Sequence, residues 1–167
     1  GECEMEKSKV ARMLLVSSFA FMGTGCMQQM AENKVNDKLR DHQRNALTCL
    51  DTEGTTARAV NQFYLYRPQI PNYKNLQAMQ NQLGEVSQAA AAFSTNDKVR
   101  HCYVGYRIVQ KWGRPESLFF AFYKESQDVG DCNRRSHFEI EDQVATIHGA
   151  DLSRDGRQIA DCHRVND

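Results

Sequence analysis

Four cysteines outside the N-terminal region constrain the possible fold more than any other feature of this sequence. They are Cys49, Cys102, Cys132 and Cys162. No C-x-x-C pair occurs, so there is little support for a zinc site or a thioredoxin-like motif. In an oxidising compartment four cysteines predict two disulfides, whereas in the cytosol they would be free thiols or metal ligands. The expected compartment therefore determines how the cysteines are interpreted.

The N-terminal segment 13–26 indicates export. It is a short apolar run that ends in small residues and Cys26, and three basic residues precede it. This is the layout of a secretory leader, and the run is shorter than the roughly 20 apolar residues that cross a bilayer. Thr24 and Gly25 match the small residues that precede the lipid-bearing cysteine of bacterial lipoproteins. Gly23 stands where those signals usually carry leucine.

We therefore expect residues 1–25 to be a cleaved, lipoprotein-type signal peptide and Cys26 to carry the lipid. A plain secretory leader cut elsewhere and an apolar helix of a cytosolic chain are the alternatives. Several acyl chains, palmitate among them, would anchor the protein stably, because each buried CH₂ contributes about 0.8 kcal/mol. Met27 rather than aspartate follows the cysteine, which predicts an outer-membrane location facing the periplasm.

Size and composition predict one domain with a modest core. Without the leader about 140 residues remain, the size of a single ordinary domain. Mean hydropathy is −0.64 and 25% of the residues are charged. Two disulfides would therefore matter, since each such loop closure stabilises by roughly 3–4 kcal/mol. Spacing allows three connectivities, of which the predicted halves of the chain favour Cys49–Cys102 and Cys132–Cys162.

Charge excludes one class of partner. The chain has 21 basic and 21 acidic residues and no block rich in lysine or arginine. A nucleic acid or an anionic membrane surface is therefore not expected as a partner. We expect contact with a membrane only through the lipid anchor.

The chain up to residue 112 is predicted to be helical. Segment 26–50 has a narrow apolar stripe and is expected to be an N-terminal helix, which either holds the domain away from the membrane or packs on it. Asn72 is a predicted helix N-cap, and the run Ser94–Asp97 offers another. The last of these helices should end near Trp112, because Gly113 suits a left-handed position and Pro115 prevents continuation.

Strands are predicted for the rest of a single domain that spans 51–167 and is strand-rich over 116–165. The aromatic run 118–123 lacks a helical period, and 137–141 alternates between polar and apolar residues. Shorter strands are expected at 144–147 and 158–162. The predicted fold class is α+β, with N-terminal helices packed on a small antiparallel sheet of about three strands and braced by two disulfides.

The sequence predicts no catalytic residue, metal site or cofactor motif. His137 and Glu139 form an H-x-E, but the Pro-Cys-x-x-Cys of zinc deaminases is absent, and no H-E-x-x-H is present. Cys102 follows His101, yet half of a disulfide explains it better than a nucleophile does. Three tyrosines flank a proline-containing loop and are the candidate partner-binding residues, namely Tyr64, Tyr66 and Tyr73.

A combination of motifs near the C-terminus resembles a known family. A predicted helix runs into Trp112-Gly-Arg-Pro-Glu116, an aromatic run follows it, and Cys132 and Cys162 bracket the later predicted strands. Residues 106–162 in this way resemble small proteobacterial outer-membrane lipoproteins of the SmpA/OmlA (BamE-like) type. The resemblance implies two helices on a three-stranded sheet, no enzymatic activity and a scaffolding role. Only Cys26, as the lipid attachment, is carried over from it.

These observations together predict a non-enzymatic, lipid-anchored envelope protein that acts as a protein-binding or scaffolding module. Its expected partner is another envelope protein, with no small-molecule cofactor. A periplasmic inhibitor of an envelope hydrolase, and a secreted protein of unrecognised enzymatic activity, are the alternatives.

Overall fold

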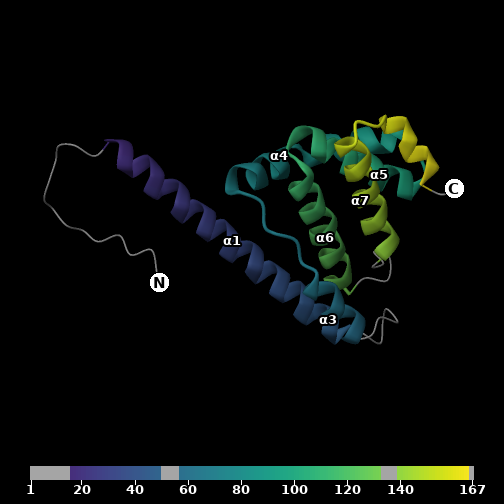
Figure 1. Cartoon of the computed structure of the whole chain (residues 1–167). Helices are drawn as coiled ribbons and strands as arrows, with labels where there is room; N and C mark the ends of the chain where they lie inside the picture. The colour runs from purple at the N-terminus through teal and green to yellow at the C-terminus, as the bar shows by residue number, and fades with distance from the viewer. Residues whose placement is uncertain (1–15, 50–56, 133–138, 166–167) are drawn as a thin grey trace, which may run out of the picture.

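Every regular element of the protein is a helix in the computed structural model, which describes residues 16–49, 57–132 and 139–165 (Figure 1). The described residues form six α-helices and one 3₁₀ helix: α1 (Val16–Thr48), α3 (Ala57–Leu65), α4 (Tyr73–Phe93), α5 (Asp97–Lys111), α6 (Arg114–Gly130), α7 (Ile140–Arg154) and η1 (Ile159–Arg164). No strand occurs within these ranges. The predicted α+β class, with its three-stranded sheet over 116–165, is therefore wrong.

The helix boundaries in the first part of the chain follow the predicted signals. The side chain of Asn72 accepts a hydrogen bond from the Asn75 backbone N–H at 2.9 Å and caps α4. Asn96 caps α5 in the same way. Helix α5 ends at Lys111, and Gly113 has a φ of +118°, a backbone conformation that glycine adopts easily. These local signals are confirmed because they depend only on neighbouring residues.

Helix α6 contains the run 118–123 that the sequence predicts as a strand, and most of the helix is buried. It packs against α1, α5 and α7, and Figure 1 shows it in the middle of the bundle. Its buried residues include Phe119 and Ala121 as well as Phe122, so they do not lie on one stripe. Every residue of the run 118–123 is buried or half-buried, so the run has no exposed polar position that would mark a helical period. The aromatic run 118–123 consequently resembled a buried strand.

Helix α7 was missed because small residues form its buried face. Ala145, Gly149 and Ala150 are buried, whereas the larger Ile140 and Val144 are 48% and 59% exposed. The strand predicted at 144–147 is therefore wrong, and Ile140, in the predicted strand 137–141, begins α7 instead. Residues 158–162, predicted as the last strand, are instead the N-cap Gln158 and the first part of η1. His137 and Phe138 lie outside the described residues.

The core lies on both sides of α6. On one side Leu39 of α1 and Phe63 of α3 pack against Phe122 of α6. On the other side α5 forms one apolar cluster with α4, and a second cluster with α7 and η1. The bundle therefore joins an α1–α3 layer to an α4–α5–α7 group through α6.

Helix α1 packs on the bundle over much of its length. Leu39 and Ala46 are 2% exposed, and the Gln28 side chain binds the carbonyl of Pro71 at 3.3 Å and the backbone N–H of Tyr73 at 2.5 Å. The alternative in which segment 26–50 packs on the domain is thus the one the structure favours. Among the helices that are described, none combines the length and the apolar character that crossing a membrane demands.

The structure contains two disulfides, as predicted, but the cysteines are paired differently. Cys49 is bonded to Cys132, and Cys102 to Cys162, and each pair has Cα atoms 5.6 Å apart. The favoured pairs Cys49–Cys102 and Cys132–Cys162 are wrong because the chain is not divided into a helical and a strand-rich half. One bond joins the end of α1 to the end of α6, and the other joins α5 to η1.

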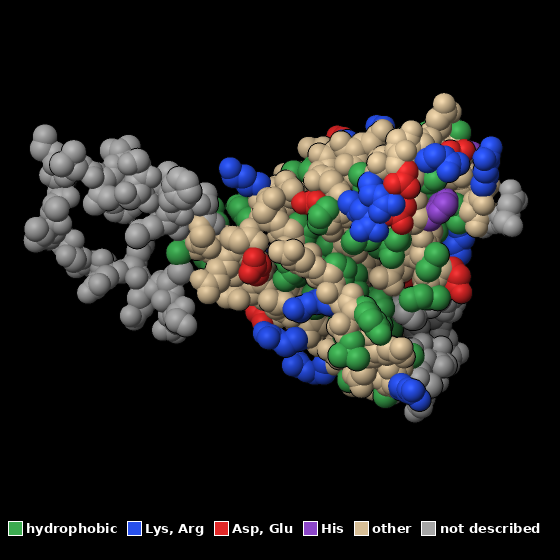
Figure 2. All heavy atoms as spheres, in the orientation of Figure 1, with side chains coloured by type: hydrophobic (Ala, Val, Ile, Leu, Met, Phe, Trp, Pro, Cys, Tyr) green, Lys and Arg blue, Asp and Glu red, His purple; other side chains and the backbone are tan. Residues whose placement is uncertain are grey.

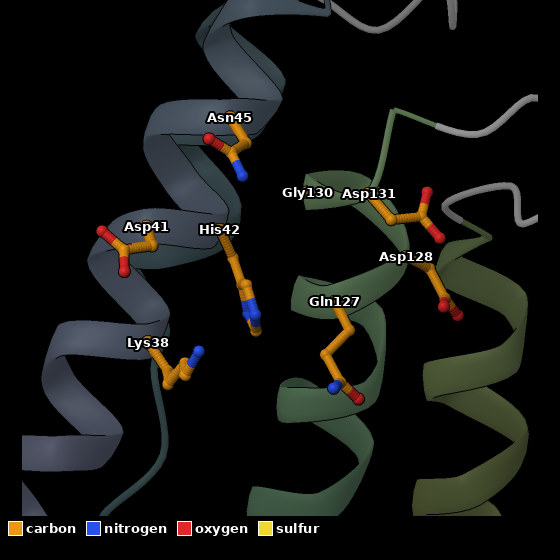
Figure 3. A pocket seen from close by; sticks show the side chains of 8 residues that line it. All are labelled: Lys38, Asp41, His42, Asn45, Gln127, Asp128, Gly130 and Asp131. Carbon is orange, nitrogen blue, oxygen red and sulfur yellow. The ribbon is translucent and has the colours of Figure 1, made fainter.

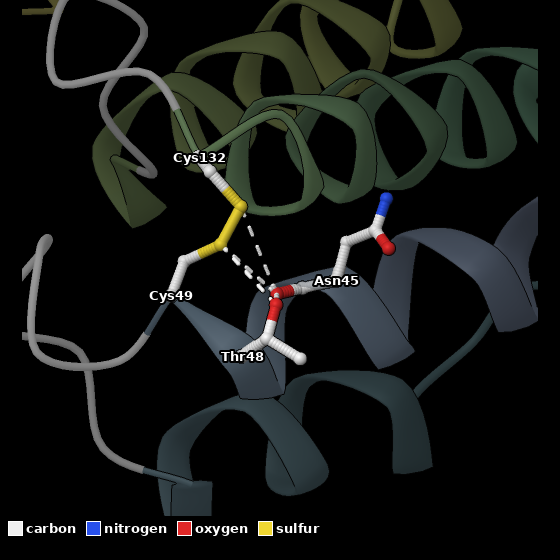
Figure 4. The surroundings of a disulfide bond; sticks show 4 residues. All are labelled: Asn45, Thr48, Cys49 and Cys132. Carbon is white, nitrogen blue, oxygen red and sulfur yellow. Dashed lines mark hydrogen bonds between the residues drawn. A yellow bond between two sulfur atoms is a disulfide. The ribbon is translucent and has the colours of Figure 1, made fainter.

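The surroundings of the Cys49–Cys132 bond are shown in Figure 4. The Thr48 hydroxyl donates a hydrogen bond to the carbonyl oxygen of Asn45 at 2.7 Å. The two sulfur atoms lie 3.1 and 3.8 Å from that same oxygen. Cys132 is exposed, whereas Cys102 and Cys162 are fully buried. The Cys49–Cys132 bond therefore joins two helix ends near the surface, whereas the Cys102–Cys162 bond joins α5 to η1 in the core.

Candidate functional site

The three predicted partner-binding tyrosines do not form one surface. Tyr64 points into the core, where its ring meets Phe122 edge-on with centroids 5.7 Å apart. Its hydroxyl is buried and has no hydrogen-bond partner among the described residues. Burial raises the pKa of Tyr64 to about 12. Tyr73 is half-buried at the start of α4, and only Tyr66 is largely exposed.

Leu65 and Tyr66 form the most exposed apolar surface next to α3, and we call this pair the α3 tip. Their side chains are 80% and 78% exposed. Figure 2 shows hydrophobic side chains gathered on the lower part of the visible face, where Figure 1 places α3. Sequence reasoning selected Tyr66 from its place beside the proline loop, but Leu65 gave no such signal.

The α3 tip is held in place by the residues on both sides of it. Phe63 stacks on Phe122 with ring centroids 4.7 Å apart, which fixes the preceding turn of α3 in the core. The guanidinium of Arg67 donates a hydrogen bond to the side chain of Asn36 on α1 at 2.9 Å. The two exposed side chains therefore extend from a backbone that is anchored before and after them.

A polar groove of about 620 Å³ lies between α1 and α6. Figure 3 shows His42 of α1 and Gln127 of α6 on facing sides of it, while Asp41 points away from α6. The eight residues that line the groove are Lys38, Asp41, His42, Asn45, Gln127, Asp128, Gly130 and Asp131. Polar side chains without an aromatic wall make this groove a poor site for an apolar ligand.

His42, which lines this groove, is paired with Ser126, but the pair is not arranged for nucleophilic catalysis. The His42 Nδ1 atom lies 3.1 Å from Ser126 Oγ. The Ser126 hydroxyl donates its only hydrogen to the carbonyl oxygen of Tyr123 at 2.8 Å, so it accepts from His42. Burial and the nearby Lys38 lower the pKa of His42, which favours the neutral ring. Because Ser126 is also fully buried, the pair fixes α1 to α6.

Glu125 is a carboxyl group buried where α6 meets the start of α7. It is 1% exposed, and one of its oxygens accepts a hydrogen bond from the backbone N–H of Glu139 at 3.3 Å. Burial, and then the negative charges of Asp128 and Asp142, raise the pKa of Glu125 to about 8. Sequence reasoning missed this group, although its position three residues after Phe122 places both on one helix face.

Replacing Glu125 with glutamine is expected to stabilise the protein at high pH and not at low pH. The ordinary pKa is 4.5 and the folded value is about 8, so the folded state retains a proton that the unfolded chain releases. The free energy of unfolding of the parent protein therefore falls as the pH rises from 4.5 to 8. Glutamine keeps an acceptor oxygen but carries no charge, and should add about 2–3 kcal/mol at pH 9.

Urea unfolding of both proteins between pH 4 and pH 9 measures this difference. Glu85→Gln, at an exposed glutamate of α4, controls for loss of a carboxylate elsewhere. A difference between Glu125→Gln and the parent that does not grow with pH would contradict the buried, protonated state of Glu125.

The remaining predicted residues have mixed outcomes. Cys102 is half of a disulfide, as expected in preference to a nucleophile. Cys26 lies half-buried on α1, and its lipid attachment stays a prediction.

Comparisons with family models, with curated proteins and with solved structures each find no match to this chain.

Proposed function

We propose that the protein is a lipid-anchored lipoprotein of the bacterial outer membrane that faces the periplasm and binds another envelope protein without catalysing a reaction. The observation that supports binding is the α3 tip, Leu65 and Tyr66. Complete burial of a leucine side chain contributes about 1.5–3 kcal/mol, and tyrosine is enriched among residues that dominate binding energy. The pair is thus suited to enter an apolar pocket of a partner.

The anchoring of the α3 tip favours binding further. Association loses free energy when flexible side chains and loops become ordered at an interface. Phe63 is fixed in the core and Arg67 is hydrogen-bonded to Asn36, so the backbone between them is already positioned. A partner would need to order only the two exposed side chains.

Lipid attachment at Cys26 would place the bundle close to the membrane. Gln28 follows Cys26 by two residues and already contacts the segment before α4 through Pro71 and Tyr73. Met27 and Met30, beside the attachment point, are 54% and 67% exposed. Apolar side chains at this position suit the boundary between headgroups and acyl chains. The proposal therefore places the start of α4 near the bilayer.

Site-specific photo-crosslinking in cells tests the proposal. A photoreactive phenylalanine derivative at position 66 should give a discrete crosslinked adduct in the membrane fraction. The same residue at the exposed position 88 of α4 is the control and should give none. Leu65→Ala should weaken the adduct about tenfold, as expected for loss of roughly 1.4 kcal/mol of binding energy. Equal labelling from positions 66 and 88 would contradict a binding role for the α3 tip.

The same cells report on the anchor and on the kind of partner. Cys26→Ser should move the chain from the membrane fraction to the soluble fraction, and an unchanged distribution would contradict lipid attachment. An adduct with a membrane-embedded complex supports scaffolding. An adduct with one soluble hydrolase supports the alternative role as an inhibitor.

A further inference from the structure

We propose that Asp97, His101 and Asp142 form a binding site for a divalent transition-metal ion of the zinc type between α5 and α7. One ligand atom from each residue lies within 4.8 Å of the other two. The sequence predicts no metal site, because only Asp97 and His101 are neighbours on a helix face and the third residue comes from α7. The packing of α7 on α5 brings the three residues together.

The distances between the ligand atoms fit a small metal ion. His101 Nε2 lies 3.4 Å from Asp142 Oδ2 and 3.7 Å from Asp97 Oδ2. Zinc binds nitrogen and oxygen ligands at about 2.0–2.2 Å in a tetrahedron, which places neighbouring ligand atoms roughly 3.3–3.5 Å apart. The two distances from His101 Nε2 are within about 0.4 Å of that spacing, and the ligand atoms of Asp97 and Asp142 lie within 4.8 Å of each other.

Thr146 sets the ring of His101 for metal binding. Its hydroxyl donates a hydrogen bond to the carbonyl oxygen of Asp142 at 2.9 Å. Having one hydrogen, it accepts from His101 Nδ1 at 3.4 Å. The neutral ring then has its lone pair on Nε2, facing the two carboxylates. A hydrogen bond from the distal ring nitrogen to a fixed acceptor is the usual support of a histidine ligand.

Each carboxylate also has one oxygen engaged elsewhere and the other directed at His101. Arg100 binds Asp97 Oδ1 at 2.7 Å, and Lys98 binds Asp142 Oδ1 at 2.5 Å. The Oδ2 atoms of both residues are the ones nearest His101 Nε2. The two carboxylate oxygens and the Nε2 atom of His101 thus converge, while Arg100 and Lys98 hold the two carboxylates in place from outside the site. A bound cation would be the largest local charge among these three atoms.

The scaffold around the site is rigid and open on one side. Helices α5 and α7 touch backbone to backbone at Gly149 and Cys102, next to His101. Cys102 is also fixed by its disulfide to Cys162. The side chain of Asp142 is 11% exposed, whereas that of Asp97 is 53% exposed. Water can therefore reach the ion from the Asp97 side and complete a fourth position.

The ligand types indicate which ion the site prefers. One imidazole and two carboxylates suit zinc and its first-row neighbours, whereas calcium and magnesium prefer oxygen ligands alone. The adjacent sulfur of Cys102 is bonded to Cys162 and does not act as a thiolate ligand. We assign the site to zinc, with cobalt as its spectroscopic substitute.

Titration of the chelator-treated, disulfide-bonded protein with zinc chloride tests the assignment. Calorimetry should find one zinc per chain, and cobalt should give visible absorption bands of a four-coordinate ion. His101→Ala and Asp142→Asn should each weaken zinc binding at least tenfold. Thr146→Val should weaken it about 10-fold to 100-fold through the lost support of the ring. His148→Ala, which removes an exposed histidine of α7, is the matched control and should bind as the parent does.

Nuclear magnetic resonance of the parent protein supplies a measurement that no variant can confound. Zinc should shift the ring signals of His101 and leave those of His148 unchanged, at pH 7.5. Retention of zinc binding in His101→Ala would overturn the proposal. So would a His101 ring that stays protonated on both nitrogens with and without zinc, because the cluster would then be an ion pair. If the variants do not fold, the ring signals of His101 in the parent protein decide whether His101 binds zinc or belongs to an ion pair.

Discussion

Replacing Cys102 and Cys162 together with alanine is expected to lower the free energy of unfolding by about 4 kcal/mol. The bond closes a loop with a sequence separation of 60 residues, and loss of that constraint frees the unfolded chain by about this amount in the loop-entropy model. Both sulfur atoms are also fully buried where α5, α7 and η1 meet, so the variant loses core contacts as well. Such a loss is a large fraction of the 5–15 kcal/mol that stabilises an ordinary domain.

Urea unfolding followed by circular dichroism measures the change. The control is Cys49→Ala with Cys132→Ala, which opens a loop of 83 residues but leaves the α5–η1 core intact. The entropic loss is similar in the two variants, so the variant that lacks the Cys102–Cys162 bond should be the less stable of the two. If its free energy of unfolding were within about 1 kcal/mol of that of the parent protein, the structural role of this disulfide would be contradicted.

Local signals determined which helices the sequence predicts correctly. Asn72 and Asn96 cap α4 and α5 through their own side chains, and Gly113 ends α5 by its backbone conformation. Each of these effects involves residues within a few positions of one another. They are therefore visible in the sequence without knowledge of the tertiary fold.

Tertiary packing determined where the predictions are wrong. Helix α6 packs against three other helices, and every residue of its run 118–123 is buried or half-buried, so this run lacks the polar positions that mark a surface helix. Helix α7 contacts α5 through glycine and alanine, which leaves Val144 exposed and its buried face inconspicuous. Parts of both helices, 118–123 and 144–147, are predicted as strands, and the disulfide pairing that depends on a strand-rich half is wrong for the same reason.

The residues of the candidate sites are likewise only partly predictable from the sequence. Tyr66 was singled out because a tyrosine beside a proline loop suits contact with a partner, and its high exposure agrees with that role. The proposed metal ligands were not singled out as a set, because Asp142 is far from Asp97 and His101 in the sequence. Only the packing of α7 on α5 brings the third ligand to the other two. Sites composed from two helices therefore require the fold.

Replacing Gly149 with alanine is expected to lower the free energy of unfolding by about 3 kcal/mol or more. A Cβ atom at this position would lie 2.7 Å from the carbonyl carbon of Cys102 and closer still to its oxygen. These are backbone atoms of α5, so α5 and α7 would have to move apart, and overpacking of this kind typically costs about 1–3 kcal/mol. The disulfide from Cys102 to Cys162 limits that movement and adds to the cost.

The same substitution at Gly84 should have the opposite sign, and this comparison isolates helix contact from helix propensity. Gly84 lies inside α4, and a Cβ atom there would meet nothing within 4 Å. Gly84→Ala should therefore raise the free energy of unfolding by about 0.5–1 kcal/mol, because alanine loses less conformational entropy in a helix. Thermal and urea unfolding of both variants measure the two effects. Similar stability of Gly149→Ala and Gly84→Ala would contradict the close packing of α5 on α7, and with it the rigid support proposed for the metal site.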